Sequence, residues 1–322
     1  MLPCPPWAKH IQESSVKHRA ILGAAVIASA VWLPQTGLAS GYTETQYPIL
    51  LVHGLFGFDH FLGANYFYKV PGELSRDGAR VFVSTVSAAN SNEVRGEQLL
   101  AEVRRILAQT GAAKINLIGH SQGSPTARYV AAVRPDLVAS VTSVGGVNAG
   151  SRVADIVRKV APPGSVSESV AAAVAGAFVK MLTFATGSDH LPQNTIAALD
   201  GLTTQGLATF NAKYPAGVPH GCGEGAHVVN GVRYYAWGGS SPVTNVLDPL
   251  DGPIGLLSLA HGVPNDGLVD TCSQRLGQVI RVDYKMNHLD QINGFFGITH
   301  LSETSPLTVY RQHANRLKNA GL

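Results

Sequence analysis

The sequence predicts an α/β fold in which helices cover both faces of a mostly parallel sheet. Two observations support this prediction. Short apolar runs alternate with helical segments from residue 47 onward, which is the order that builds parallel sheets. In addition, 45% of the 322 residues are hydrophobic and only 14% are charged, so a large core can be buried. The composition therefore excludes a disordered chain.

Six segments have the length and apolar character of strands. The first, residues 47–52, is continuously apolar and suits a strand that is buried on both faces. The remaining strands are expected at residues 80–86, 114–118, 138–144, 232–237 and 278–284.

Helices are indicated by a 3.6-residue apolar period. In residues 93–109 this period is clearest, with Asn90 or Asn92 as possible N-cap and Gly111 as C-cap. Two more helices are expected at residues 124–133, stopped by Pro135, and at residues 307–318.

Residues 151–187 interrupt the alternation with Ala- and Val-rich helical sequence that carries few charges. Because strand signals resume at residue 232, we interpret this stretch as a helical cap inserted into one domain, residues 40–322. Its apolar positions recur on one helical face at Val170, Val174, Phe178, Met181 and Leu182.

The first 39 residues have the pattern of a signal peptide. Basic residues 17–19 precede an apolar stretch, residues 20–33, and small residues lead to a cleavage point after Ala39. A membrane anchor is the alternative, but Pro34 ends the apolar stretch before the roughly 20 residues that a span requires. A secreted protein without a stable membrane anchor is therefore expected.

Charge and cysteine content fit this expectation. The formal net charge of +3 is spread without a basic run, which argues against a nucleic-acid partner. Removal of the signal peptide leaves Cys222 and Cys272, and an oxidising compartment favours one disulfide between them. Such a bond would close a loop of about fifty residues and contribute about 4 kcal/mol, the alternative being two buried free thiols.

The pentapeptide Gly-His-Ser-Gln-Gly, residues 119–123, lies between a predicted strand and a predicted helix. A GxSxG turn in this context is a nucleophile elbow, in which glycines permit a tight turn that exposes the serine above the sheet. Ser121 is therefore the predicted nucleophile.

A serine hydroxyl needs a base and a carboxylate that orients this base. His288 is favoured because it follows the strand 278–284, in a loop that can overhang the carboxyl ends of the sheet. Asp266 is favoured as the acid because residues 265–267 resemble a turn at a strand end. Spacing alone leaves the other candidates open, namely His190, His220, His227, His261, His300 and His313 for the base, and Asp248, Asp251, Asp270 and Asp283 for the acid.

Two backbone N–H groups must stabilise the oxyanion of an acyl-transfer intermediate. The elbow supplies the N–H of Gln122, the residue after the nucleophile. The glycine-containing loop 53–57 supplies a candidate second donor, the N–H of Leu55, whereas His53 is expected to have a structural role.

With these motifs the chain resembles the secreted triacylglycerol lipases of Pseudomonas and Burkholderia, which have the α/β-hydrolase fold. The resemblance covers nearly all of residues 47–322 and is carried by residues 47–57, 94–100, 119–123, 128–133, 222–225, 265–269 and 286–290. It implies a triad of Ser121, Asp266 and His288, oxyanion donors Leu55 and Gln122, and a disulfide between Cys222 and Cys272.

The same resemblance implies one structural calcium ion, held by the carboxylates of Asp248 and Asp290 and by the carbonyls of Gly294 and Ile298. Hard oxygen ligands of this kind suit Ca²⁺. A dedicated foldase chaperone and export through the periplasm to the medium are also implied by resemblance.

The expected function is hydrolysis of acylglycerols at an oil–water interface. A carboxylesterase or polyester depolymerase could use the same triad, because fold alone does not fix the substrate. A lipid-binding protein with an inactive site is the non-enzymatic alternative.

Overall fold

The computed structural model describes residues 41–57, 66–159, 167, 169–170, 173–174, 176–178 and 191–322. The predicted signal peptide and most of the predicted cap lie outside these residues, so both remain predictions. Residues Ala39–Leu322 belong to one compact unit.

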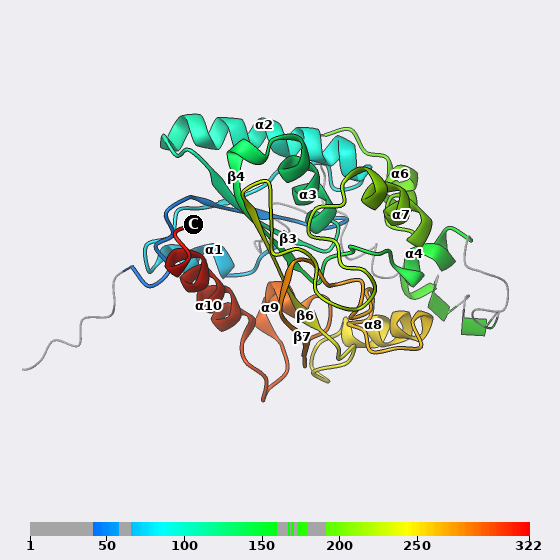
Figure 1. The fold of residues 1–322 in the computed structure, drawn as a ribbon. Helices are drawn as coiled ribbons and strands as arrows, with labels where there is room; N and C mark the ends of the chain where they lie inside the picture. The colour runs from blue at the N-terminus through cyan, green and yellow to red at the C-terminus, as the bar shows by residue number, and fades with distance from the viewer. Residues whose placement is uncertain are drawn as a thin grey trace, which may run out of the picture. The chain divides into compact units, whose positions relative to one another are not determined.

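A mostly parallel sheet of seven strands forms the centre of this unit (Figure 1). The strand order is β2-β1-β3-β4-β6, and both β5 and β7 pair with β6. Every described pair is parallel except β5 with β6. The bounds are β1 Ile49–Val52, β2 Val81–Val83, β3 Ile115–His120, β4 Val138–Val144, β5 Val228–Val229, β6 Val232–Gly239 and β7 Gln278–Tyr284.

Helices cover both faces of the sheet, which confirms the predicted fold class. Helices α2 and α3 lie on one face, and α1 and α10 lie on the other (Figure 1). The helices are α1 Val70–Ser75, α2 Asn92–Thr110, α3 Gly123–Val133, α4 Arg152–Val157, α6 Thr195–Asp200, α7 Thr204–Lys213, α8 Asp251–Leu257, α9 Gly294–Gly297 and α10 Pro306–Asn319, with 3₁₀ turns η1 Pro135–Leu137, η2 Ser258–Ala260 and η3 Asp290–Ile292.

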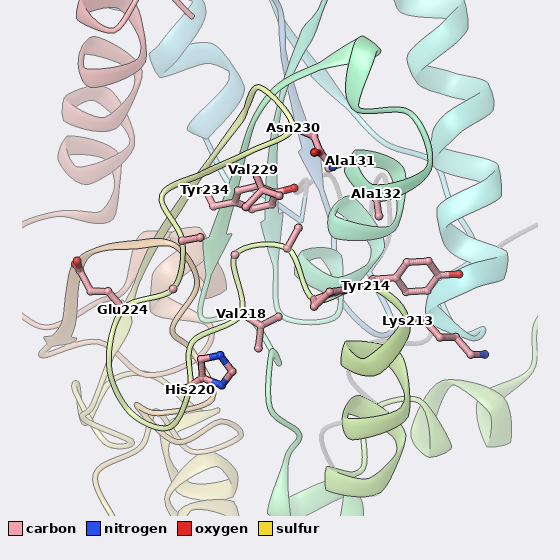
Figure 2. A pocket seen from close by; sticks show the side chains of 15 residues that line it. Ala131, Ala132, Lys213, Tyr214, Val218, His220, Glu224, Val229, Asn230 and Tyr234 are labelled. Atoms are coloured by element: carbon pink, nitrogen blue, oxygen red, sulfur yellow. The ribbon is translucent and has the colours of Figure 1, made fainter.

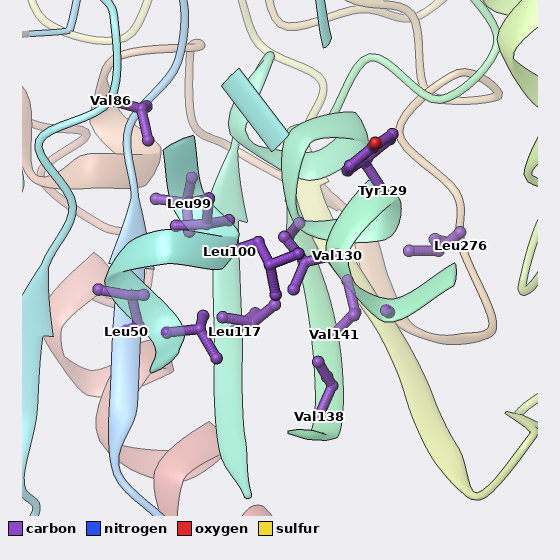
Figure 3. Close-up of a cluster of buried hydrophobic side chains, with 14 of the residues drawn as sticks. Leu50, Val86, Leu99, Leu100, Leu117, Tyr129, Val130, Val138, Val141 and Leu276 are labelled. Atoms are coloured by element: carbon purple, nitrogen blue, oxygen red, sulfur yellow. The ribbon is translucent and has the colours of Figure 1, made fainter. Parts of the chain in front are cut away.

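The alternation of side chains along β1 explains why this strand is apolar throughout. Leu50 and Val52 pack into the core under α2 and α3, where Leu99 and Val130 meet them (Figure 3). Ile49 and Leu51 point to the opposite face and join the core under α1 and α10. A strand buried on both faces can be apolar at every position.

The boundaries of the strands and long helices differ from the sequence predictions mainly at their ends. The strand expected at residues 80–86 is confined to β2, three residues long. The N-cap of α2 is Ser91, whose Oγ accepts the Val94 N–H at 3.3 Å, so neither Asn90 nor Asn92 caps this helix. Gly111 ends α2 in the left-handed conformation, as predicted.

Part of the predicted cap is described and is packed as core. Val174, Ala177 and Phe178 are buried against side chains of α4, α8 and η2, together with Leu199. Within the part of the chain that the structure describes, no helix is sufficiently long and apolar to cross a membrane.

Candidate active site

Ser121 occupies the strained turn that the GxSxG motif predicts. It directly follows β3 and has a φ of 55°, a left-handed conformation that is rare for serine. A Cβ on Gly119 would collide with the backbone of Gly123, and one on Gly123 would collide with the Val52 carbonyl. The two glycines are therefore required for β3, the turn and α3 to pack this closely.

His288 and Asp266, which lie on different loops, are brought into contact. Nδ1 of His288 lies 2.8 Å from Oδ2 of Asp266, and both side chains are buried. The backbone N–H of His288 also donates to the Asp266 carbonyl at 2.9 Å. Since the carboxylate accepts from Nδ1, the free lone pair of the neutral ring is on Nε2.

His288, the candidate base, also lies beside the turn that carries Ser121. The rings of His288 and His120 are 4.6 Å apart, and His120 immediately precedes Ser121. Nε2 of His288 is buried and has no hydrogen-bond partner among the described residues, and thus none with the Ser121 hydroxyl. Hydrogen bonds of a catalytic pair are often formed only in the substrate complex.

The Asp266 carboxylate is held by more donors than His288 alone. Oδ1 accepts the N–H groups of Leu268 at 3.1 Å and Val269 at 2.8 Å. Oδ2 accepts, besides His288, the side-chain amide of Gln291 at 2.8 Å. Four donors fix the position of the carboxylate and leave it little freedom to turn. Sequence reasoning did not identify Gln291.

The other candidate histidines lie in different environments. His313 is buried and bonded to Thr142, and His261 is buried with no carboxylate hydrogen-bonded to its ring in the described part of the chain. His220, His227 and His300 are at least partly exposed, and His190 lies outside the described residues. Among the candidate histidines that the structure describes, His288 is thus the only one that is buried and has a ring nitrogen hydrogen-bonded to a carboxylate.

The alternative acids are engaged elsewhere. Asp251 accepts the backbone N–H groups of Thr244 and Asn245, both at 2.6 Å, and the Asn287 amide at 2.7 Å. Asp270 accepts the N–H groups of Cys272 and Ser273, and Asp283 pairs with Arg281 at the surface. Asp248 lies in the loop before α8, where it accepts the Leu250 N–H at 2.8 Å.

The two predicted oxyanion donors belong to segments that one buried side chain connects. The N–H groups of Leu55 and Gln122 donate to no group in the described residues, whereas the neighbouring Phe56 N–H donates to the Ala88 carbonyl. Nη1 of Arg95 donates to the Gly54 carbonyl at 3.1 Å and to Oε1 of Gln122 at 3.2 Å. The guanidinium therefore contacts both donor-bearing segments. Its role was not evident from the sequence, because its partners lie far along the chain.

The predicted calcium residues gather next to this site. Asp248 and Asp290 are both buried, and Oδ1 of Asp290 has no hydrogen-bond partner among the described residues. Burial raises the pKa of Asp290 to about 7 and the pKa of Asp248 to about 6. The neighbouring charges of Asp251 and Asp248 contribute to this rise in the pKa of Asp290. Clustered, buried carboxylates with an orphaned oxygen fit a bound cation.

The two predicted carbonyl ligands follow in the same loop. Gly294 begins α9, and its N–H donates to the Leu289 carbonyl at 2.9 Å. Ile298 follows the end of this short helix and is partly buried. The donor set of two carboxylates and two carbonyls is the oxygen-only set that calcium prefers. No cluster of three or more His, Cys, Asp or Glu side chains suited to a metal occurs among the described residues.

Cys222 and Cys272 form a disulfide between positions 50 residues apart. Cys272 follows the turn that starts at Asp270, four residues after Asp266. The bond therefore ties the loop before β5 to the segment that carries the candidate acid.

A cavity of about 520 Å³ lies at the far end of α3 from Ser121 (Figure 2). Ala131 and Ala132 of α3, Tyr214 and Tyr234 contribute to its wall. Burial raises the pKa of Tyr234 to about 12, so its hydroxyl stays protonated near neutral pH. None of the predicted site residues lines this cavity, and we assign no chemistry to it.

The fold and the serine elbow define the class of protein. Residues 47–269 match the family model described as alpha/beta hydrolase fold, and the chain therefore belongs to the α/β-hydrolase family. It is a hydrolase. Solved structures that share the fold include a mature Bacillus licheniformis lipase, BlEst2, with a TM-score of 0.56 and 19% identity over 77% of this chain and 87% of that one. A metagenomic carboxyl esterase, MGS0156, has a TM-score of 0.55 and 17% identity over 86% of this chain and 76% of that one.

Relatives with higher sequence identity indicate a narrower group within this family. A Vibrio cholerae protein named triacylglycerol lipase is 58% identical over 94% of this chain and 98% of its own length. Proteins of the same name from Pseudomonas fragi and Burkholderia plantarii are 47% and 40% identical, covering 87% and 90% of this chain and 98% and 90% of their own lengths. The resemblance inferred from the sequence motifs is thus confirmed.

Proposed function

We propose that this enzyme hydrolyses the carboxylic esters of acylglycerols with Ser121 as nucleophile, His288 as base and Asp266 as the residue that orients the base. The observation that carries the proposal is the buried His288–Asp266 pair next to the strained Ser121 turn. The substrate class is supported by the triacylglycerol lipases to which the chain is 40% to 58% identical.

In the acylation half, Oγ of Ser121 attacks the ester carbonyl while Nε2 of His288 takes the hydroxyl proton. The N–H groups of Leu55 and Gln122 donate to the negative oxygen of the tetrahedral intermediate. When the intermediate collapses, the C–O bond to the alcohol breaks, and His288 returns the proton to the leaving alcohol. An ester between the acyl group and Ser121 remains.

In the second half, a water molecule attacks this acyl ester. His288 removes one proton from the water, the same N–H groups stabilise the second intermediate, and the proton returns to Oγ of Ser121 as the fatty acid leaves. Asp266, held by its four hydrogen-bond donors, orients His288 and stabilises the imidazolium formed in each half.

Asp248 and Asp290, with the carbonyls of Gly294 and Ile298, would hold one calcium ion. A bound cation would neutralise the two buried carboxylates and thereby stiffen the loop. Asp290 is two residues from His288, and its Oδ2 accepts the Asn287 N–H at 3.2 Å. The backbone that carries the base is therefore bonded to a proposed calcium ligand.

The proposal includes the setting in which the enzyme works. Residues 1–39 act as a signal peptide, the mature chain passes through the periplasm, and it acts outside the cell at an oil–water interface. A dedicated foldase assists its folding. These statements rest on the N-terminal sequence pattern and on the resemblance to secreted lipases, and expression of the chain with and without its signal peptide would test the first of them.

Active-site labelling tests the mechanism directly. A fluorophosphonate probe should label the wild-type enzyme on Ser121, and Ser121→Ala should lose both labelling and tributyrin hydrolysis while keeping its thermal midpoint. Ser124→Ala is the matched control, since this nearby buried serine donates to Asn148 instead. Equal labelling of wild type and Ser121→Ala would reject the nucleophile.

A comparison of substrates tests the chemical class. Hydrolysis of an emulsified long-chain triglyceride is expected alongside hydrolysis of a soluble short ester. Activity confined to soluble or polymeric esters would indicate an esterase or depolymerase. Lipid binding without labelling or hydrolysis would indicate an inactive binding protein.

A further inference from the structure

A buried chain of hydrogen bonds connects Gly54, Tyr66, His120 and His288 at the candidate site. The proposed hydrolytic mechanism assigns no role to this hydrogen-bond chain. It starts at the Gly54 N–H, which lies 3.1 Å from the Tyr66 hydroxyl. This hydroxyl lies 2.7 Å from Nδ1 of His120, and Nε2 of His120 lies 2.9 Å from the His288 carbonyl. Tyr66, His120 and His288 are all buried.

The direction of each hydrogen bond follows from the last acceptor. A carbonyl oxygen can only accept, so Nε2 of His120 must carry a proton. Burial, and next the neighbouring His288, hold the pKa of His120 well below its usual value, so its ring is neutral and Nδ1 accepts from the Tyr66 hydroxyl. The Tyr66 oxygen in turn accepts from the Gly54 N–H. Each hydrogen bond in this series thus has one direction, and the three directions are consistent with one another.

This hydrogen-bond chain connects three segments, which carry the proposed oxyanion donor, the nucleophile and the base. Gly54 precedes Leu55, the proposed oxyanion donor. His120 precedes Ser121, and the carbonyl at the other end belongs to His288 itself. The segments are also tightly packed, because a Cβ on Gly54 would lie 2.7 Å from Cβ of Ser121 and 2.8 Å from the Tyr66 hydroxyl.

We propose that Tyr66 and His120 are positioning residues, which fix the oxyanion loop and the base relative to the nucleophile through this chain. The inference rests on the proposed hydrolytic function. Positioning errors of about 1 Å can lower a rate by about a hundredfold, so loss of one bond should reduce turnover more than substrate binding. A neutral His120 also avoids a second positive charge beside the His288 imidazolium.

Two substitutions of His120 each keep one of its two hydrogen bonds and remove the other. In His120→Gln, the side-chain amide can reach the Nε2 position and donate to the His288 carbonyl, but nothing accepts from Tyr66. In His120→Asn, the amide oxygen takes the Nδ1 position and accepts from Tyr66, but the bond to His288 is lost. Tyr66→Phe removes only the hydroxyl, and Tyr68→Phe is a matched control two residues away.

The test measures kcat and KM on a soluble short ester, with thermal midpoints of each protein. The proteins are wild type, Tyr66→Phe, His120→Gln, His120→Asn, the double variants of Tyr66→Phe with each His120 substitution, and Tyr68→Phe. Tyr66→Phe should lower kcat about tenfold or more and change KM less than twofold, whereas Tyr68→Phe should resemble wild type. In the His120→Gln background, Tyr66→Phe should lower kcat less than it does in wild type, because the bond to His120 is already absent and only the bond from the Gly54 N–H is lost. In the His120→Asn background, Tyr66→Phe should lower kcat as much as it does in wild type, because the asparagine amide oxygen still accepts from the Tyr66 hydroxyl.

Wild-type kcat in Tyr66→Phe, or an effect on KM alone, would overturn the proposal. An equal loss from Tyr66→Phe with and without His120→Gln would also overturn it, since the two residues would then act independently. If His120→Gln does not fold, the kcat and KM of Tyr66→Phe decide alone. Failure of the proposed function would look different, because wild type itself would neither hydrolyse the ester nor react with the fluorophosphonate.

Discussion

His288 is joined to Asp266 twice, by its ring nitrogen Nδ1 to Oδ2 at 2.8 Å and by its backbone N–H to the Asp266 carbonyl at 2.9 Å. The side-chain bond sets the orientation of the ring, and the backbone bond fixes the distance between the two loops. A substitution of the Asp266 carboxylate can therefore change the orientation of the His288 ring, while the backbone bond still holds the two loops together.

Asp266→Asn tests this separation. The amide presents a donor where His288 needs an acceptor, which favours the wrong tautomer, and kcat should fall about 10³- to 10⁴-fold. The thermal midpoint should change little, because the backbone bond between the residues stays. Steady-state kinetics on a soluble ester together with thermal unfolding would measure both.

Asp283→Asn is the control for this substitution. Asp283 was also an acid candidate from the sequence, but it is exposed and pairs with Arg281. It should keep wild-type kcat within about twofold, as expected of a surface ion pair. A larger loss in Asp283→Asn than in Asp266→Asn would reject the assignment of the acid.

The sequence predicted the elements of the fold well because their signals are local. Apolar runs and the 3.6-residue period depend on neighbours within a few positions, and β4 and β7 begin and end where expected. The predicted N-cap of α2 was wrong because the side chains of both asparagines form other hydrogen bonds. Asn90 accepts the Ser91 N–H, and Asn92 donates to the Gly201 carbonyl, which leaves Ser91 to cap the helix.

The candidate site was predictable only in part, for the same reason. Ser121 lies in a contiguous motif, whereas Asp266 was favoured among five acids only by the turn pattern of residues 265–267 and then by the resemblance. Arg95, Gln291 and the Tyr66–His120 pair were not identified at all. Arg95 lies 41 residues from Gly54, Gln291 lies 25 residues from Asp266, and Tyr66 lies 54 residues from His120, so only the tertiary fold brings these partners together.

Calcium removal should destabilise the loop that carries the base. If Asp248 and Asp290 hold the ion, chelation leaves two buried carboxylates without a cation, and both the thermal midpoint and the rate of ester hydrolysis should fall. Calcium at a hundred times its dissociation constant should stabilise the fold by about 2.7 kcal/mol. Thermal unfolding with EDTA and with added calcium would measure the difference.

Asp248→Ala should make the protein insensitive to both treatments. Asp270→Asn is a suitable control, since this aspartate accepts the N–H groups of Cys272 and Ser273 and should leave the calcium response intact. An Asp248→Ala protein that still gained full stability from calcium would place the ion elsewhere.

His313 should make the fold sensitive to acid. It is buried in α10, its Nε2 bonds to Thr142, and burial followed by the charge of Arg316 lowers its pKa to about 3. The unfolded chain binds a proton near pH 6.5, whereas the folded chain does not, so stability falls as the pH decreases from about 6.5 towards 3.

Replacement of His313 by glutamine should remove this contribution. At about 1.4 kcal/mol per pKa unit, the wild type should lose about 2 to 3 kcal/mol more than His313→Gln between pH 6.5 and 4.5. Urea unfolding at both pH values would measure this. A constant difference between the two proteins across this range would show that His313 does not titrate on unfolding.

Phe178 of the predicted cap lies close to the loop that carries the proposed oxyanion donor. Its ring lies 6.2 Å from that of Phe56, the residue after the proposed donor Leu55, and Val174 and Phe178 are buried with side chains of α4 and α8. In water this packing is that of ordinary core. In a lipid hydrolase the same apolar face would have a second use, because contact with lipid removes the cost of exposing it.

Each large apolar side chain contributes about 1.5 to 3 kcal/mol on burial, so transfer of several to a lipid surface could offset opening of the cap. Phe178→Asp should therefore reduce hydrolysis of an emulsified long-chain triglyceride at least several-fold more than hydrolysis of a monomeric short-chain ester, because the charge penalises lipid contact and leaves Ser121, His288 and Asp266 in place. Ile196→Asp, at an exposed position of α6, is the control for an added charge and should affect both substrates alike. If Phe178→Asp folds stably and loses both activities equally, this face is core alone and takes no part in contact with lipid.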